Sequence, residues 1–155
     1  MKVYLVQHGR QVSKEEDPQR PLSAQGRADV ERVALFLEKA GVKVEEIIHS
    51  GKLRAMQTAE ILSSRIGSGT AISEWKGISP LDDVKPVAAQ IQEGKCDRML
   101  VGHLPHMAKL ASLLTAGDET SDVIAFQQGA VVCLREIEGQ GWAVAWMVVP
   151  ELLPA

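Results

Sequence analysis

Near its start the chain reads Val3-Tyr4-Leu5-Val6-Gln7-His8-Gly9-Arg10, and the rest of the fold is expected to form around this segment. Four consecutive apolar residues, most of them branched or aromatic, are typical of a short strand that is buried on both faces. Gly9 then allows a sharp turn directly after a histidine. We therefore expect a strand whose end positions the His8 imidazole.

A second apolar run, Met99–Val101, also ends at a histidine. Gly102 and His103 follow it, and Pro105 then marks a position where a helix can begin. If both strands belong to one parallel sheet, their carboxyl ends lie at the same edge, where open α/β sheets bind ligands. We therefore expect an active site at this edge that contains His8 and His103.

A third apolar run, Ile47-Ile48, leads through His49 and Ser50 to the segment Lys52–Ala59. A serine and an arginine, Arg54, thus fall at a helix start on the same edge. Helix N-termini carry unpaired N–H groups, which bind anions together with arginine. Histidines beside arginines indicate chemistry on phosphate.

Strand and helix patterns alternate over most of the chain. Helices are predicted from the Ser23 cap to about Gly41 and at Leu53–Ile66, Val84–Glu93 and Pro105–Thr115, and further strands at Val44–Ser50, Thr70–Trp75, Ala130–Ile137 and Trp142–Val149. The apolar positions predicted on one side of the second helix are Leu53, Met56, Ala59, Leu62 and Ile66. The alternation indicates a parallel sheet, and Glu138–Gly141 is typical of a hairpin turn. The predicted fold is α/β, with three layers (α/β/α), a mostly parallel central sheet and an antiparallel C-terminal strand pair.

Length and composition indicate one domain, residues 1–155, with 45% hydrophobic and 24% charged residues. The net charge of −3 argues against a nucleic-acid binder that neutralises many phosphates. Cys96 and Cys133 are too few for a disulfide scaffold or a tetrahedral metal site. The sequence has neither a signal-peptide pattern nor a membrane-spanning run, so we expect a cytoplasmic protein with no membrane or nucleic-acid partner. The polar segment Gln11–Arg20 is predicted to be a surface loop placed to gate access to the edge of the sheet.

These segments resemble those of the histidine phosphatase superfamily, the phosphoglycerate-mutase-like phosphatases, and most closely its short bacterial phosphohistidine phosphatase branch. Members have Arg-His-Gly after the first strand, where this chain has Gln7-His8-Gly9. Their Ser-Pro-x-x-Arg-Ala-x-Gln-Thr-Ala segment is matched by Ser50–Ala59, and their Val-x-His segment by Val101-Gly102-His103. The Arg-Pro-Leu-Ser/Thr stretch of the short branch is matched by Arg20–Ser23. Four matches in the same order make the resemblance specific.

The resemblance implies a phosphoglycerate-mutase-like fold and a catalytic set of His8, Arg54 and His103. It implies that His8 attacks phosphorus and becomes a transient phosphohistidine. A neutral imidazole with one free nitrogen can act in this way, and nearby arginines lower its pKa below about 6.5. The Arg54 guanidinium is expected to grip two phosphoryl oxygens, and His103 to act as a second cationic or hydrogen-bonding group. We expect no cofactor, and no metal because no histidine pair has the close helical spacing of metal motifs.

Gln7 is the main departure from the family pattern, which has a phosphate-binding arginine at this position. An amide supplies hydrogen bonds but no charge, and the loss of one charge-assisted contact typically costs about 1.5–3 kcal/mol. Arg20 and Arg10 are the local cations that can compensate, and with Gln7 and Gly9 they form the expected phosphate-binding set. Gly51 replaces the family proline, which loosens the turn there.

The proton donor for the leaving group is expected after the third strand, where Glu74, Asp82 and Asp83 are the candidates. The alternative for each is a solvated loop acid. An imidazole can leave as a protonated ring, so phosphohistidine hydrolysis does not need a strong protein acid. Of the other histidines, His49 is expected to be structural and His106 to lie near the rim of the site.

Together these features predict a metal-independent phosphohydrolase that dephosphorylates phosphohistidine in proteins. The chain lacks the long insertion with which larger relatives cover small sugar phosphates, which indicates an open site. Inorganic phosphate or a similar anion is expected to bind in the pocket. The alternatives are a phosphatase of small phosphomonoesters, and a pseudo-enzyme that binds phosphate or protein because Gln7 has removed useful turnover.

Overall fold

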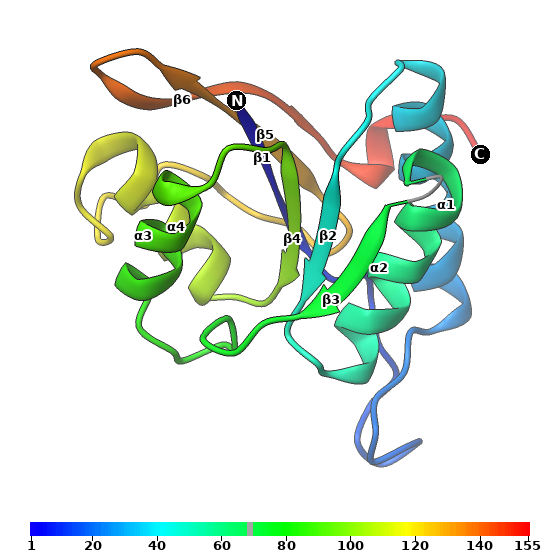
Figure 1. The fold of residues 1–155 in the computed structure, drawn as a ribbon. Coiled ribbons are helices and arrows are strands. Elements are labelled where there is room, and N and C mark those ends of the chain that lie inside the picture. Colours follow the sequence, from blue (N-terminus) through cyan, green and yellow to red (C-terminus); the bar gives the residue numbers. More distant parts are fainter. Residues whose placement is uncertain (68–69) are drawn as a thin grey trace.

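β1 (Lys2–Gln7) lies inside a six-stranded sheet, between parallel β4 (Arg98–Gly102) and antiparallel β5 (Val131–Ile137). The strand order is β3-β2-β4-β1-β5-β6 (Figure 1). The other strands are β2 (Glu46–His49), β3 (Ala71–Glu74) and β6 (Gly141–Val148). The computed structural model describes residues 1–67 and 70–155. The predicted sheet is confirmed, because β1 to β4 are mutually parallel and β5 and β6 form an antiparallel pair.

Helices cover both faces of this sheet. One face carries α1 (Ala24–Lys39) and α2 (Leu53–Ile66), and the other carries α3 (Lys85–Glu93) and α4 (His106–Ala116) (Figure 1). A short 3-10 helix, η1 (Pro150–Leu152), lies against α1. The three-layer α/β/α arrangement is therefore the predicted one. Among the described residues, no helix has both the length and the apolar character needed to cross a membrane.

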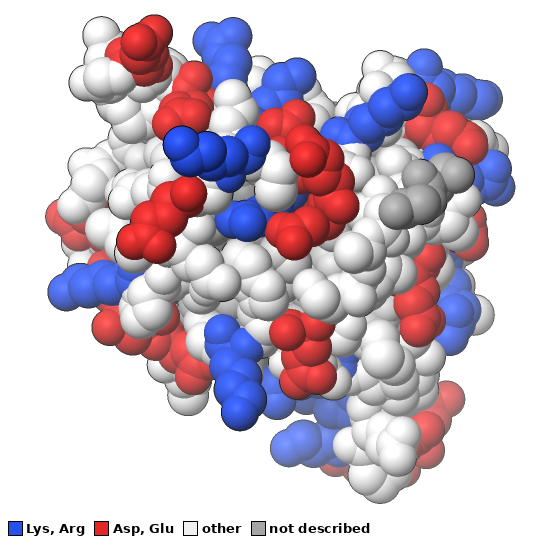
Figure 2. Space-filling model, in the orientation of Figure 1, with Lys and Arg blue, Asp and Glu red and all other residues white. Residues whose placement is uncertain are grey.

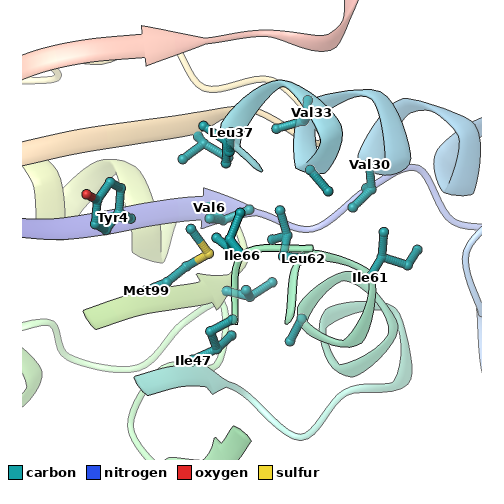
Figure 3. Close-up of a cluster of buried hydrophobic side chains, with 14 of the residues drawn as sticks. Tyr4, Val6, Val30, Val33, Leu37, Ile47, Ile61, Leu62, Ile66 and Met99 are labelled. Carbon is teal, nitrogen blue, oxygen red and sulfur yellow. The ribbon is translucent and has the colours of Figure 1, made fainter. Parts of the chain in front are cut away.

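β1 is buried on both faces, as its sequence predicts. Tyr4 and Val6 join the cluster beneath α1 and α2, whereas Val3 and Leu5 join the cluster beneath α3 and α4. Figure 3 shows the first cluster, with Tyr4 nearer to the start of β1 than Val6. Each such side chain contributes about 1.5–3 kcal/mol when fully buried. The strand is therefore firmly anchored, and His8 follows at its end.

The first turns of α1 pack closely against residues 9 and 10, which follow β1. Ser23 caps the helix, because its Oγ accepts the N–H of Gly26 at 3.0 Å. The N–H of Ser23 also donates to the Arg10 carbonyl oxygen at 2.9 Å. Gly26 packs so tightly that a Cβ there would overlap this same carbonyl oxygen, and a Cβ at Gly9 would lie 2.8 Å from Cγ2 of Val30. Both glycines are needed for this close contact.

The loop between β1 and α1 is irregular, as predicted, and projects beyond the carboxyl ends of the strands (Figure 1). A single antiparallel bridge between Gln11 and Leu22 joins its two ends. The loop therefore returns to the edge of the sheet immediately before α1.

The buried face of α2 differs from the prediction in its first turn. Leu53 and Met56 are only half-buried, whereas Ala55 and Thr58 are fully buried. This first turn borders the edge of the sheet rather than its apolar face, so the apolar periodicity does not identify its inner side. The later positions face the core as predicted, and element boundaries differ from the predicted ones by at most two residues.

Candidate active site

Two histidines lie together at the carboxyl edge of the sheet. Gln7 pairs with Gly102 in the parallel register of β1 and β4, so His8 and His103 follow on adjacent strands. Their ring centroids are 4.9 Å apart and their planes are inclined by 51°. Only 6% of His8 and 2% of His103 is exposed. The structure thus brings these two expected site residues together.

The His8 ring is oriented by its own main chain. Its Nδ1 lies 2.7 Å from the carbonyl oxygen of Gly9. A carbonyl oxygen only accepts hydrogen bonds, so Nδ1 carries the proton and Nε2 keeps its lone pair. Burial lowers the pKa of His8 to about 4; the Gly9 bond opposes this shift, and the charges of Arg54 and Arg20 add to it. At pH 7 the ring is therefore neutral, which is the form that a nucleophile requires.

His103 is held by a serine. The Oγ of Ser50 lies 2.6 Å from Nε2 of His103, while Nδ1 is buried and has no partner in the described chain. Burial lowers the pKa of His103 to about 3, and His8 and Arg54 add to this shift. In the free protein His103 can thus offer a hydrogen bond rather than a positive charge. A bound dianion raises this pKa again, because an opposite charge favours the protonated ring.

Arg54 and Arg20 bring positive charge to the same place. Arg54 lies in the first turn of α2, whose N-terminus has no side-chain cap. Arg20 adopts a φ of +51°, a left-handed conformation that is costly for a residue with a Cβ. Burial and the charge of Arg20 lower the pKa of Arg54, and both arginines lower the pKa of His8.

The two guanidinium groups fit a bound anion. The Nε atoms of Arg20 and Arg54 are buried and have no acceptor among the residues that the structure describes. A buried donor without an acceptor costs about 1–3 kcal/mol, and more when it is charged. An oxyanion between the arginines would supply the acceptors.

Gln57 and Thr58, which the sequence did not single out as functional, hold this arrangement in place. The Oγ1 of Thr58 accepts the N–H of Gly9 at 3.0 Å and donates to the carbonyl oxygen of Arg54 at 2.8 Å. The Oε1 of Gln57 accepts the N–H of Leu22 at 2.8 Å, two residues after Arg20. Consecutive residues of α2 therefore position both the segment after His8 and the loop that carries Arg20.

The other expected phosphate contacts have different surroundings. Gln7 is 8% exposed, and its Oε1 is buried without a donor among the described residues. The N–H of Gly9 is already bound to Thr58. The predicted sharp turn at Gly9 is wrong, because residues 8–10 have neither a turn nor a bend, and Gly9 instead allows the close packing against Val30. Arg10 is exposed and lines a separate cavity of about 160 Å³ together with Asp29. The structure therefore directs Arg10 to another part of the surface.

Of the three candidate acids, Glu74 lies in β3, and Asp82 and Asp83 lie in the loop between β3 and α3. Glu74 ends β3, and its carboxylate packs over Gly51, where a Cβ would overlap it. Asp82 accepts the main-chain N–H of Ser79 at 2.9 Å, and Asp83 accepts that of Lys85, the first residue of α3, at 3.0 Å. Glu74 thus borders the turn after Ser50, whereas the two aspartates stabilise the loop before α3.

Gly51 makes a contact that proline cannot make. It has a φ of +90°, and its N–H donates to Nδ1 of His49 at 3.0 Å. Proline has a fixed negative φ and no N–H. The glycine that replaces the family proline therefore permits this hydrogen bond. His49 is only 7% exposed, and this contact is structural.

His106 does not lie at a rim. Its exposed fraction is 0%, and neither ring nitrogen has a hydrogen-bond partner in the part of the chain described. Burial lowers the pKa of His106, and the charges of Asp82 and Asp83 oppose this shift. The prediction is wrong because the first turn of α4 is covered by the loop after β3.

The positive charge of the site is local. Figure 2 shows acidic and basic side chains interspersed over the face it presents, in keeping with the net charge of −3. In the described ranges, 1–67 and 70–155, no three His, Cys, Asp or Glu residues are grouped so that they could hold a metal ion.

The neutral histidines make stability depend on pH. In the unfolded chain they bind protons as the pH falls through about 6.5, but in the folded protein His8 does so only near 4 and His103 near 3. The free energy of unfolding therefore falls as the pH falls from about 6.5 to about 4. The free energy of unfolding can be measured with urea at pH 7 and at pH 4. Between these two pH values it should fall by at least about 1 kcal/mol more in the wild type than in the double variant His8→Gln/His103→Gln. Equal losses would contradict the two neutral rings.

Known proteins resemble this chain over most of its length. Phosphohistidine phosphatase SixA of Escherichia coli (strain K12) is 28% identical over 155 residues, which cover 97% of this chain and 94% of that protein. An uncharacterised protein of Picosynechococcus sp. is 28% identical over 143 residues, 87% of this chain and 85% of that protein. The structure of the protein histidine phosphatase SixA complexed with tungstate has a TM-score of 0.86 at 25% identity, and covers 98% of this chain and 99% of that one.

The likeness to the tungstate-bound structure confirms the predicted phosphoglycerate-mutase-like fold. The model of the histidine phosphatase superfamily (branch 1) matches residues 3–82, which contain β1, the Arg20 loop and α2. This chain therefore belongs to branch 1 of the histidine phosphatase superfamily, and it is a phosphatase.

Proposed function

We propose that this phosphatase acts without a metal ion, through a phosphohistidine formed on His8, and that its substrate is a phosphorylated histidine of a protein. The observation that carries the proposal is the state of His8. Its ring is neutral, with Nδ1–H bound to the Gly9 carbonyl and Nε2 unprotonated beside the second histidine and two arginines. These groups supply the nucleophile and the charge stabilisation that phosphoryl transfer requires.

In the first step Nε2 of His8 attacks phosphorus in line with the leaving nitrogen of the substrate. A new N–P bond forms while the substrate N–P bond breaks, and the electron pair of the broken bond stays on the leaving imidazole. When its other nitrogen carries a proton, this imidazole departs as a neutral ring, so no strong protein acid is needed. Arg54 and Arg20 stabilise the non-bridging oxygens, and His103 donates to one of them.

In the second step a water molecule attacks the phosphorus of phospho-His8. The N–P bond breaks, its electron pair returns to Nε2, and phosphate leaves with the oxygen of the water. The water protons remain on phosphate or pass to the solvent. The Nδ1 bond to Gly9 holds the ring in one orientation through both steps.

The similarity to SixA supports an oxyanion site and this substrate class. Tungstate, bound in the similar SixA structure, is a tetrahedral oxyanion like phosphate. SixA of E. coli is a phosphohistidine phosphatase, and the lengths of the two chains nearly coincide. A short chain without a covering insertion leaves room for a bulky protein substrate.

The test is a substrate panel in the presence of EDTA. We expect a phosphohistidine-containing protein to be hydrolysed with a higher kcat/KM than an aryl phosphate or a sugar phosphate, and chelation to leave the rate unchanged. A preference for a small phosphomonoester would instead support that alternative substrate class. Loss of activity that added zinc restores would overturn the metal-independent mechanism.

Gln7 favours a second candidate, a phosphate-binding protein with weak turnover, because it supplies no charge. Gln7→Arg is expected to raise kcat/KM by about 10- to 100-fold, since it adds a charge-assisted contact to the phosphoryl group. Gln7→Met, which has a similar length but an apolar end, is the matched control and should lower kcat/KM. If the arginine variant shows no gain in rate or phosphate affinity, this account of position 7 is wrong.

A further inference from the structure

A second cavity lies at the opposite end of β1 from the histidines. Its volume is about 580 Å³, and its walls include Lys2 and Tyr4. Lys2 starts β1 and lies six residues before His8, which corresponds to about 20 Å along an extended strand. This cavity is therefore separate from the phosphoryl site.

The cavity exists because the helix layer does not reach the edge of the sheet. α1 ends at Lys39, and the chain turns back at Gly41, where φ is +75°. The sheet continues past β1 to β5 and β6, and Trp146 of β6 lies on the same face as Tyr4. Figure 3 shows Tyr4 at the end of the cluster nearest to the start of β1. At this end the sheet face is left partly uncovered next to the cavity.

Three aromatic rings from three elements line the cavity. The centroids of Tyr4 on β1 and Trp146 on β6 are 5.8 Å apart, with the planes inclined by 52°. Phe36 on α1 is 43% exposed and faces the same space. Ligand pockets typically enclose about 300–1,000 Å³ and are lined by aromatic side chains. The size and lining thus fit a flat, apolar ring system of small-molecule size.

The charges of the lining favour an anion. Lys2 and Lys43 are exposed at the cavity, and no carboxylate of the described chain lies within 4.0 Å of either ammonium group. Asp97, the one acid of the lining, accepts the main-chain N–H of Lys2 through Oδ1 at 2.8 Å. Two lysines therefore face the space with no acidic side chain paired to them.

We propose that this cavity binds an aromatic anion, a ring system of about two fused rings that carries one carboxylate or sulfonate group. The rings lie between Tyr4, Trp146 and Phe36, and the anionic group lies at Lys2 and Lys43. This site is independent of the phosphatase reaction, so its test does not depend on the mechanism proposed for His8.

The probe is 1-anilinonaphthalene-8-sulfonate, titrated into the full chain by calorimetry and by tryptophan fluorescence. We expect one saturable site per chain, from which saturating inorganic phosphate does not displace the dye. Energy transfer from tryptophan to the bound dye should be weaker in the Trp146→Phe variant. Lys2→Gln/Lys43→Gln should weaken binding about tenfold, because it removes two exposed charge contacts. Phe36→Ala should weaken binding about fivefold through the loss of one ring contact.

Two controls separate this site from non-specific dye binding. Lys85→Gln/Lys109→Gln removes two lysines on the opposite face of the sheet and should leave the affinity unchanged. The uncharged analogue N-phenyl-1-naphthylamine should bind the wild type and the Lys2→Gln/Lys43→Gln variant equally.

Three results would overturn the proposal. They are the absence of saturable binding, displacement of the dye by phosphate, and equal affinity in the wild type and the Lys2→Gln/Lys43→Gln variant. A dimer in sedimentation velocity that the dye dissociates would assign this face to a second copy of the chain instead. Thermal unfolding of each variant checks that the fold is intact.

Discussion

His8→Ala is expected to lose catalysis almost completely, with kcat lower by about 10⁴-fold or more, because the variant lacks the residue that we propose forms the covalent intermediate. Incubation with a labelled phosphodonor should give an acid-labile phosphoprotein in the wild type and none in the variant. The loss should appear in kcat rather than in phosphate affinity, since Arg54 and Arg20 remain in place. His8→Asn, which keeps a polar side chain at this nearly buried position, should give the same result and guards against a folding defect.

The location of the label separates the mechanisms. Acid-labile label that persists in His8→Ala would move the nucleophile elsewhere, with His103 as the nearest candidate because its ring lies 4.9 Å away. Phosphate that binds to the wild type without label or turnover would support the pseudo-enzyme. Either result would leave the fold assignment unchanged, because the fold rests on the sheet order and on the similar structures.

Gly26→Ala is expected to destabilise the protein by about 1–3 kcal/mol through overpacking, although alanine is favoured over glycine inside a helix by about 1 kcal/mol. The added Cβ would overlap the Arg10 carbonyl oxygen, which belongs to the main chain and cannot rotate away. α1 or the segment after His8 must then move. A shift of about 1 Å at a catalytic group can cost about 100-fold in rate, so kcat/KM should fall together with stability.

Ala28→Gly is the matched control on the exposed face of the same helix. This variant replaces alanine by glycine and should lower the free energy of unfolding by about 1 kcal/mol through helix propensity alone. Its kcat/KM should be unchanged. Urea unfolding and steady-state kinetics on both variants make the comparison. If Gly26→Ala is as stable as the wild type, α1 does not need its close contact with Arg10.

The sheet and the grouping of the histidines could be predicted because they follow from local patterns. An apolar run that ends in a histidine, repeated at β1 and β4, places His8 and His103 at one edge once the strands are parallel. The start of α2 brings Arg54 to this edge by the same logic. Each inference needs only strand direction and the rule that ligands bind at the carboxyl ends.

Contacts between residues far apart in the sequence could not be predicted in this way. The bond of Thr58 to Gly9 spans 49 positions, and the bond of Ser50 to His103 spans 53. A hydroxyl inside a helix or a turn has no pattern that indicates its partner. Arg10 was expected near the phosphate because it lies two residues after His8, but its side chain lines another cavity together with Asp29.

The hydroxyl of Thr58 has a consequence for motion at the site. One oxygen atom bridges the peptide that follows His8 and the main chain of Arg54. The same peptide is also bound on its other side, where the His8 carbonyl oxygen accepts the N–H of Gly129 at 3.1 Å, so it joins α2 to the segment before β5. We therefore expect the spacing between His8 and Arg54, on which the proposed in-line transfer depends, to change little as the protein fluctuates.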